Sequence, residues 1–393
     1  MTNTPQWIWQ QPDWPTFAFD MKVVAPVLYR ARSTQGRVLG KAQALGLANL
    51  GSALAEIWVE EANATARIEG EKLDLNAVRS SVALRLGLPS VGTASRSVEG
   101  LIDLMDDATR HWREPLTVAR LCGWQAALFP TGFAGVKKVK SGALRTHAAP
   151  MQIVSGPIGR EKVHFEAPPS KRLPRELRGF LDWFQTSRDS PVDGLLRAGT
   201  AHLWFETVHP FEDGNGRVGR AIIDLALAQD AKLDQRLYSV SRRLAENRDD
   251  YYAELAAASR GGLDITRWLT WFVEQFEEAC RVSEAVIDLS LAKARFWLQH
   301  GQAPLSERQR KAVNRILDAG PGGFEGGMST DKYGNLVRVS RATAYRDLEE
   351  LVRYGLLTQA GVGRGTRYFA AMEGWEAGSR NQDLVSSSRV RGR

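Results

Sequence analysis

The chain has 393 residues, 43% of them hydrophobic, and a formal net charge of +7 at pH 7. A chain of this length can bury several cores, so we expect two or three domains. The two cysteines, Cys122 and Cys280, lack metal-ligand spacing and exclude a disulfide framework, which favours a reducing compartment. The chain opens without a signal-peptide pattern and contains no apolar run long enough for a membrane span. We therefore expect a cytoplasmic protein with no membrane partner.

Residues 1–95 are expected to form an N-terminal region with a short tryptophan-rich segment followed by helices. Within it, residues 52–69 predict a helix, because Gly70 is a natural residue in the left-handed conformation just after a helix end. The carboxylate of Glu69 would then meet the negative end of the helix dipole. We expect Glu69 to need an arginine partner; a solvated helix end is the alternative.

Residues 96–285 are expected to form a helical body that contains one β-hairpin. The hairpin is predicted over residues 141–169, with the turn Gly156-Pro157-Ile158-Gly159 between two short strand-like runs. By residue pattern alone it is an ordinary surface hairpin.

The segment 209–220 reads HPFEDGNGRVGR and carries several chemically active groups in twelve positions. The residues before it predict a helix, and those after it are apolar enough for a buried helix. Gly214-Asn215-Gly216 therefore lies where a loop turns into a helix N-terminus. The free backbone N–H groups and the helix dipole there favour phosphate groups, such as those of a nucleotide.

The side chains around this turn suit phosphate chemistry. His209 could accept a proton from an attacking hydroxyl. Asp213 is a hard oxygen ligand suited to Mg²⁺. Arg217 and Arg220 are three residues apart on the new helix, so they share a face and can both reach phosphate oxygens. A loop with surface ion pairs is the alternative for each feature taken alone.

A zinc site is a competing interpretation, because His202, Glu206 and His209 are spaced to share one helical face. Pro210 argues against it. The residue before a proline is pushed out of the α region, so His209 would leave that face. We therefore expect His202 and Glu206 to be buried polar residues with hydrogen-bond partners.

Residues 286–304 predict a bridging helix, beginning near Ala285, and a short linker. Residues 305–370 then predict three helices and a small hairpin, with Ser340 as the N-cap of the third helix, and they resemble a winged helix-turn-helix. Residues 371–393 are expected to be a disordered polar tail.

From residue 305 onward the chain has 15 Lys and Arg and 10 Asp and Glu, an excess of +5. The segment 340–367 could contact DNA phosphates or base edges through Arg341, Thr343, Arg346, Arg364 and Arg367. Many modules of this kind mediate protein contacts instead, and that alternative stays open.

The string from His209 to Arg220 matches the signature HPFx(D/E)GNGRxxR of the Fic family at every defined position. The chain therefore resembles a Fic-domain protein, most of which transfer AMP from ATP to a hydroxyl side chain of a protein target. The resemblance implies a mainly α fold, namely a Fic-type helical bundle with a β-hairpin flap, here followed by the winged helix-turn-helix.

The resemblance also implies roles for single residues. His209 would be the catalytic base, and Asp213 would hold Mg²⁺. Tyr251 and Tyr252 resemble the family's adenine-pocket tyrosines, although Ser259 stands where many members have Asn. The implied ATP-binding residues are Asp213, Gly214, Asn215, Gly216, Arg217, Val218, Gly219, Arg220, Tyr251 and Tyr252.

Two further segments gain a meaning from the resemblance. The sequence TARIEG, Thr65 to Gly70, fits the family's inhibitory pattern (S/T)xxxE(G/N), so Glu69 would pair with Arg220 and block seating of the ATP γ-phosphate. The flap at 141–169 would dock the protein target by strand pairing.

Three alternatives stay open. The same pocket could remove AMP from a modified protein. The chain could instead be a DNA-binding regulator whose Fic domain senses nucleotide, although the presence of both His209 and Asp213 argues against a purely sensory role. A homodimer is compatible with the sequence, as is a monomer.

Overall fold

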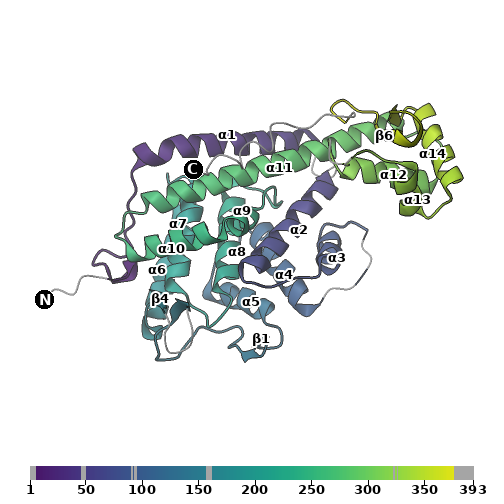
Figure 1. Cartoon of the computed structure of the whole chain (residues 1–393). Helices are drawn as coiled ribbons and strands as arrows, with labels where there is room; N and C mark the ends of the chain where they lie inside the picture. The colour runs from purple at the N-terminus through teal and green to yellow at the C-terminus, as the bar shows by residue number, and fades with distance from the viewer. Residues whose placement is uncertain are drawn as a thin grey trace. The chain divides into compact units, whose positions relative to one another are not determined.

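The computed structural model describes residues 6–45, 50–89, 92, 95–155, 162–321, 324 and 326–375. The chain divides into two compact units, Met1–Ile287 and Asp288–Arg393. Helices dominate the described residues of both units, and the strands form three two-stranded sheets (Figure 1). The predicted mainly α class is therefore confirmed. None of the helices in the described ranges combines the length and apolarity that a membrane crossing requires.

The first unit opens with a short aromatic segment and three helices. The segment contains the 3₁₀ helix Ile8–Gln10, and the helices are α1 (Met21–Leu45), α2 (Gly51–Ile68) and α3 (Leu75–Arg85). Helix α2 ends one residue before the predicted boundary, so that Glu69 is its C-cap residue. Gly70 has φ 78° and takes the left-handed conformation that was expected of it. Helices α1 and α3 are among the helices expected in residues 1–95, for which no bounds were predicted.

The body of the first unit is built around α7 (Gly194–Val208) and α8 (Asn215–Ala231), which pack against each other. Both are buried on nearly all sides, and α8 buries charged side chains such as Arg220 and Asp224 together with its apolar ones. The helices around them are α4 (Arg96–Arg110), α5 (Val118–Leu128), α6 (Leu173–Thr186), α9 (Val240–Glu246), α10 (Arg248–Arg260) and the first part of α11 (Thr266–His300).

The predicted hairpin is present as β3 (Gln152–Ser155) paired antiparallel with β4 (Lys162–Glu166). Its expected turn at 156–159 lies outside the described residues. Two N-terminal tryptophans contact strand β4 of this hairpin. Trp7 meets Phe165 edge to face at 5.5 Å, and Trp9 Nε1 donates to the carbonyl oxygen of Glu166 at 2.7 Å. A second, smaller hairpin joins β1 (Phe133–Ala134) and β2 (Lys137–Lys138).

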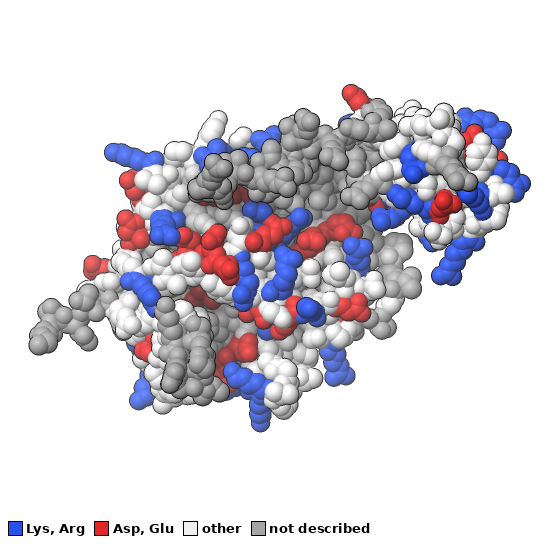
Figure 2. Space-filling model, viewed as in Figure 1, with Lys and Arg blue, Asp and Glu red and all other residues white. Residues whose placement is uncertain are grey.

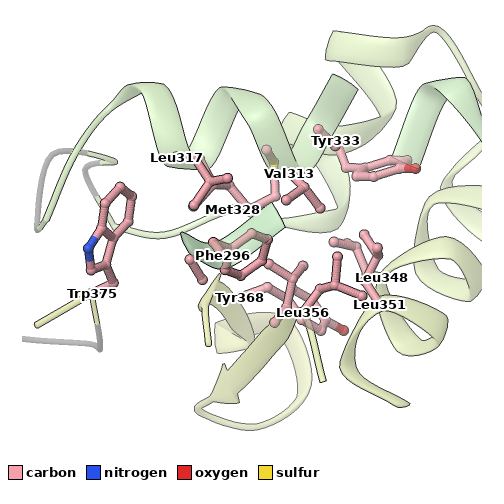
Figure 3. Packing of buried hydrophobic residues seen from close by; sticks show 14 of the residues in the cluster. Phe296, Val313, Leu317, Met328, Tyr333, Leu348, Leu351, Leu356, Tyr368 and Trp375 are labelled. Carbon is pink, nitrogen blue, oxygen red and sulfur yellow. The ribbon is translucent and has the colours of Figure 1, made fainter. Parts of the chain in front are cut away.

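The second unit contains α12 (Glu307–Asp318), α13 (Thr330–Val337), α14 (Arg341–Arg353) and the hairpin of β5 (Leu357–Ala360) and β6 (Arg367–Ala370). Figure 3 shows its apolar core, in which side chains from the helices and from β6 meet Trp375. The tail expected from residue 371 is therefore wrong for residues 371–375, because Trp375 is buried in this core; residues 376–393 lie outside the described residues. Ser340 caps α14 as predicted, because its Oγ accepts from the N–H of Thr343 at 3.2 Å.

The bridging helix does not begin near Ala285 as predicted. It is the last part of α11, which runs without a break from Thr266 to His300. The sequence between these residues contains no glycine or proline, so nothing in it ends the helix earlier.

Candidate active site

The loop between α7 and α8 begins at His209, whose backbone is left-handed with φ 47°. Pro210 disfavours the α region for the residue before it, so α7 must end here. The N–H of His209 still bonds to the carbonyl oxygen of Phe205 at 2.9 Å, which closes the last helical turn. His209 therefore does not share the helical face of His202 and Glu206, as was predicted from Pro210.

Arg145 holds this loop in place. Its Nε donates to the carbonyl oxygen of His209 at 2.7 Å, and its backbone N–H donates to the carbonyl oxygen of Pro210 at 3.0 Å. Another nitrogen of the same guanidinium donates to Pro168 O at 2.6 Å. Burial lowers the pKa of Arg145 to about 10. Arg145 was missed in the sequence, because only the fold brings it to residues more than sixty positions away.

Asn215 closes the loop from the other side. Its side-chain oxygen accepts from the N–H of Phe211, and its side-chain nitrogen donates to the carbonyl oxygen of Phe211, each at 2.9 Å. Phe211 is fully buried and anchors the loop in the core. The Asn215 side chain therefore shapes the loop, so a contribution of this residue to a ligand would come from its backbone N–H.

Glycines allow the close approaches at this turn. Gly214 has φ 86°, and a Cβ atom there would lie 2.9 Å from the ring of Phe129. A Cβ atom at Gly216 would overlap Oε1 of Glu69. The carboxylate of Glu69 thus lies directly against the first turn of α8, in the place where the sequence predicted an anion.

Glu69 pairs with Arg220. Its Oε1 accepts from Arg220 Nη2 at 2.6 Å, and Arg220 Nε donates to Thr65 Oγ1 at 2.7 Å. The Arg220 side chain is 3% exposed and that of Glu69 is 29% exposed. Burial alone would raise the pKa of Glu69, but the Arg220 guanidinium outweighs burial and lowers it. Burial alone would lower the pKa of Arg220, but the Glu69 carboxylate outweighs burial and raises it.

Arg217 pairs with the carboxylate of Glu71, a contact that was not predicted from the sequence. Its Nη1 lies 3.0 Å from Oε1 and 3.1 Å from Oε2 of Glu71, and its guanidinium stacks over the Phe129 ring at 5.1 Å. Asp213 Oδ1 is further away, at 3.9 Å. A signal for this pair was present in the sequence. Two glutamates, Glu69 and Glu71, flank Gly70, and the motif offers two arginines on one helical face to pair with them.

The ring of His209 is placed to act as a base. Its Nδ1 lies 3.3 Å from the carbonyl oxygen of Glu206, which can only accept, so Nδ1 carries the proton and Nε2 keeps its lone pair. Burial, together with the charge of Arg145, lowers the pKa of His209 to about 4. Burial also raises the pKa of Glu206 to about 8, against the effect of Arg220. The imidazole is therefore neutral at pH 7.

The zinc interpretation finds no support in this geometry. His202 Nε2 lies 2.7 Å from the hydroxyl of Tyr251, and burial lowers the pKa of His202 to about 3. The partner expected for Glu206 is not found, because its buried Oε1 has no hydrogen-bond partner among the described residues. Across the described part of the chain, no group of three or more His, Cys, Asp or Glu side chains could hold a metal ion by itself. Asp213 is a single, 36% exposed carboxylate beside the turn, which fits a Mg²⁺ ion held mainly by phosphates.

The two tyrosines differ in what they can reach. Tyr251 is buried against His202 and stacks on Trp271 at a centroid distance of 6.1 Å, so it belongs to the core. Tyr252 is 38% exposed, and the Arg248 guanidinium lies over its ring at 5.0 Å. Of the pair, Tyr252 is the better candidate for stacking on a base.

Comparison with known proteins agrees with this geometry. The Fic/DOC family profile matches residues 115–227, and a domain of unknown function (DUF4172) matches residues 7–88. A probable protein adenylyltransferase of Aquifex aeolicus is 30% identical over 106 residues, which are 27% of this chain and 30% of that protein. Protein adenylyltransferase fic-1 of Caenorhabditis elegans is 32% identical over 88 residues, 22% of this chain and 16% of the relative. The chain thus matches less than a third of the length of these relatives.

Two solved structures share the fold. A Fic family protein from Desulfovibrio desulfuricans G20 aligns with a TM-score of 0.51 at 21% identity, over 87% of this chain and 95% of the other. A Fic domain containing signaling protein from Bacteroides thetaiotaomicron aligns with a TM-score of 0.50 at 15% identity, over 66% of this chain and 97% of the other. The Fic resemblance predicted from residues 209–220 is confirmed by the family match and by this fold.

The environment of His209 predicts its titration. In the folded protein the ring should stay neutral as the pH falls from 7.5 to 5.5 and should gain its proton only near pH 4, because burial penalises the charged form. NMR of isotope-labelled histidine would show this, with the signal assigned by its loss in His209→Ala. In urea the same signal should titrate near pH ~6.5. A folded-state midpoint near that value would show that the ring is not buried as described.

Proposed function

We propose that this chain, whose residues 115–227 belong to the Fic/DOC family, transfers AMP from ATP to a hydroxyl side chain of another protein. The observation that carries the proposal is the neutral His209 beside a helix N-terminus that presents Arg217 and Arg220. The relatives named protein adenylyltransferases support the same reaction. Free thiols at Cys122 and Cys280 fit a reducing compartment, and we place the reaction in the cytoplasm.

The reaction follows from the positions of these groups. The target hydroxyl attacks the α-phosphorus of ATP and gives its proton to Nε2 of His209. A new oxygen–phosphorus bond forms, the bond from the α-phosphorus to the bridging oxygen breaks, and pyrophosphate leaves. Backbone N–H groups of the first turn of α8, from Asn215 to Arg217, and the two arginines stabilise the negative charge of the phosphates. Asp213 would hold Mg²⁺, which neutralises phosphate charge when bound.

Substrate placement uses two other elements. Tyr252 would stack on the adenine, with Tyr251 behind it holding the ring in place. The hairpin would receive the target along β3, which in the described residues pairs only with β4. On β4, the carbonyl oxygens of Val163 and Glu166 already accept from Arg260 and Trp9.

The resting protein is inhibited by Glu69. Its carboxylate pairs with Arg220 and lies against Gly216, so it occupies space that the γ-phosphate needs. ATP would then bind without its α-phosphorus in line with the attacking hydroxyl.

His209→Ala should abolish AMP transfer while leaving ATP affinity nearly unchanged, because it removes a proton acceptor and not a phosphate contact. We expect the rate to fall by roughly 10²- to 10⁴-fold. Autolabelling with α-labelled ATP and Mg²⁺ measures the rate, and calorimetry measures ATP affinity. Transfer at the wild-type rate would show that His209 is not the base.

Glu69→Gly should increase autolabelling, because it frees Arg220 for the γ-phosphate. A charge-assisted pair of this kind is worth roughly 1.5–3 kcal/mol, so the increase could reach about a hundredfold. The double variant Glu69→Gly with Arg220→Ala should lose the gain.

Unchanged transfer in a folded Glu69→Gly protein would exclude the inhibitory role. Lower transfer together with lost hydrolysis of AMP from a modified target would instead favour the reverse reaction.

We also propose that the second unit binds DNA through α14. Arg341 and Arg346 are exposed near its start, and basic side chains are more extensive than acidic ones on the visible face of this unit (Figure 2). Arg341 lies 3.7 Å from Asp331, but both of these side chains are mostly exposed, so Arg341 and Arg346 can reach a DNA backbone.

The double variant Arg341→Ala and Arg346→Ala should weaken binding to duplex DNA and reduce the salt slope by about two, one for each lost phosphate contact. Arg353→Ala, at the far end of α14, is the matched control, because it removes an exposed arginine from the same helix. Equal DNA binding by the two variants would contradict DNA binding through the start of α14.

A further inference from the structure

The end of α2 carries two carboxylates, not one. Glu69 and Glu71 flank Gly70, whose left-handed backbone turns the chain sharply after the helix. The turn is held by two hydrogen bonds, from the N–H of Gly70 to Arg67 O and from the N–H of Glu71 to Ala66 O, each 3.0 Å long. The same capping turn therefore fixes the backbone from which both carboxylates extend.

The two carboxylates face the two arginines of α8. Glu69 lies 2.6 Å from Arg220, and Glu71 lies 3.0 Å from Arg217. Positions three apart on a helix share a face, so the paired carboxylates cover both cations together. One capping turn thus closes the whole basic side of the helix N-terminus.

Arg217 is a buried cation that needs an anion. Its side chain is 8% exposed and packs on the ring of Phe129. Its Nε is buried and has no hydrogen-bond partner among the described residues. Glu71 supplies the close carboxylate contacts, since Asp213 is 3.9 Å away. An anion that replaced Glu71 would therefore meet a cation already held in position.

We propose that Glu71 is a second inhibitory carboxylate, which competes with the nucleotide phosphates for Arg217. This inference rests on the proposed AMP transfer and assigns a further control to the same site. ATP must then displace two carboxylates to bind productively, Glu71 from Arg217 and Glu69 from Arg220.

The surroundings of the two carboxylates set an order for their release. Glu71 is 45% exposed, against 29% for Glu69, so solvent and salt weaken its ion pair more. Glu71 and Arg217 also line an open cavity of about 510 Å³ beside Phe129, which gives the Glu71 side chain room to move away. Glu71 should therefore leave first, and Glu69 second.

The test is the affinity for ATP with Mg²⁺, measured by calorimetry on the full chain. It is made in a His209→Ala background, so that no transfer interferes. Glu71→Gln should bind ATP roughly 1.5- to 5-fold more tightly, the range expected for a half-exposed ion pair. Glu56→Gln is the matched control, because Glu56 is an exposed glutamate on α2 that pairs with Arg79, away from α8. The difference in ATP affinity between Glu71→Gln and Glu56→Gln should become smaller as salt is added, because salt screens the ion pair that Glu71→Gln removes.

Labelling with His209 intact gives a second readout. Glu71→Gln should lower the KM for ATP and leave kcat nearly unchanged, whereas a purely structural role would change the unfolding temperature without improving KM. Equal or weaker ATP binding by Glu71→Gln than by Glu56→Gln would overturn the proposal. If no variant labels itself, Glu69→Gly included, the proposed AMP transfer fails, and the ATP affinities still decide the role of Glu71.

Discussion

The site depends on an excess of positive charge at the first turn of α8. The helix dipole, the free N–H groups and two largely buried arginines meet at this turn, and such a cluster must be paired with anions. In the resting chain the anions are the carboxylates of Glu69 and Glu71. During the proposed reaction they are the phosphates of ATP. In the proposed function, inhibition and catalysis are therefore two ways of neutralising the same charges, and activity would depend on which anion occupies the site.

The carboxylates can compete only if α2 is held firmly against α8 and α9. A buried cluster does this: Glu61 of α2 accepts hydrogen bonds from Ser239 Oγ at 2.7 Å and from the N–H of Ser241 at 3.1 Å. Arg236 lies 3.7 Å from Glu61 and 2.6 Å from Asp224 of α8. Burial raises the pKa of Asp224 to about 6 despite Arg236. Because these groups are paired inside the protein, α2 delivers its C-terminal carboxylates in a fixed position.

Local signals in the sequence predicted a large part of the site. The end of α7 at His209 follows from Pro210, and the anion-binding turn follows from Gly214 and Gly216, because these effects act within a few residues. Arg145 and Glu71 escaped prediction, because their partners lie more than sixty positions away in the chain and the family resemblance gave neither residue a role, as it did for Glu69. The bounds of α1 and α3 were not predicted and the bridging helix was started too late, since helix boundaries depend on packing as well as on local preference.

The most direct test of the account is to incubate the Glu69→Gly protein with ATP and Mg²⁺, labelled in separate experiments on the α- or the γ-phosphate. The account predicts that only the α-label becomes bound to protein, and that the γ-label is released as pyrophosphate. Transfer of the γ-label to protein would identify phosphoryl transfer instead. Failure of a folded, ATP-binding protein to take up either label would contradict AMP transfer by this site.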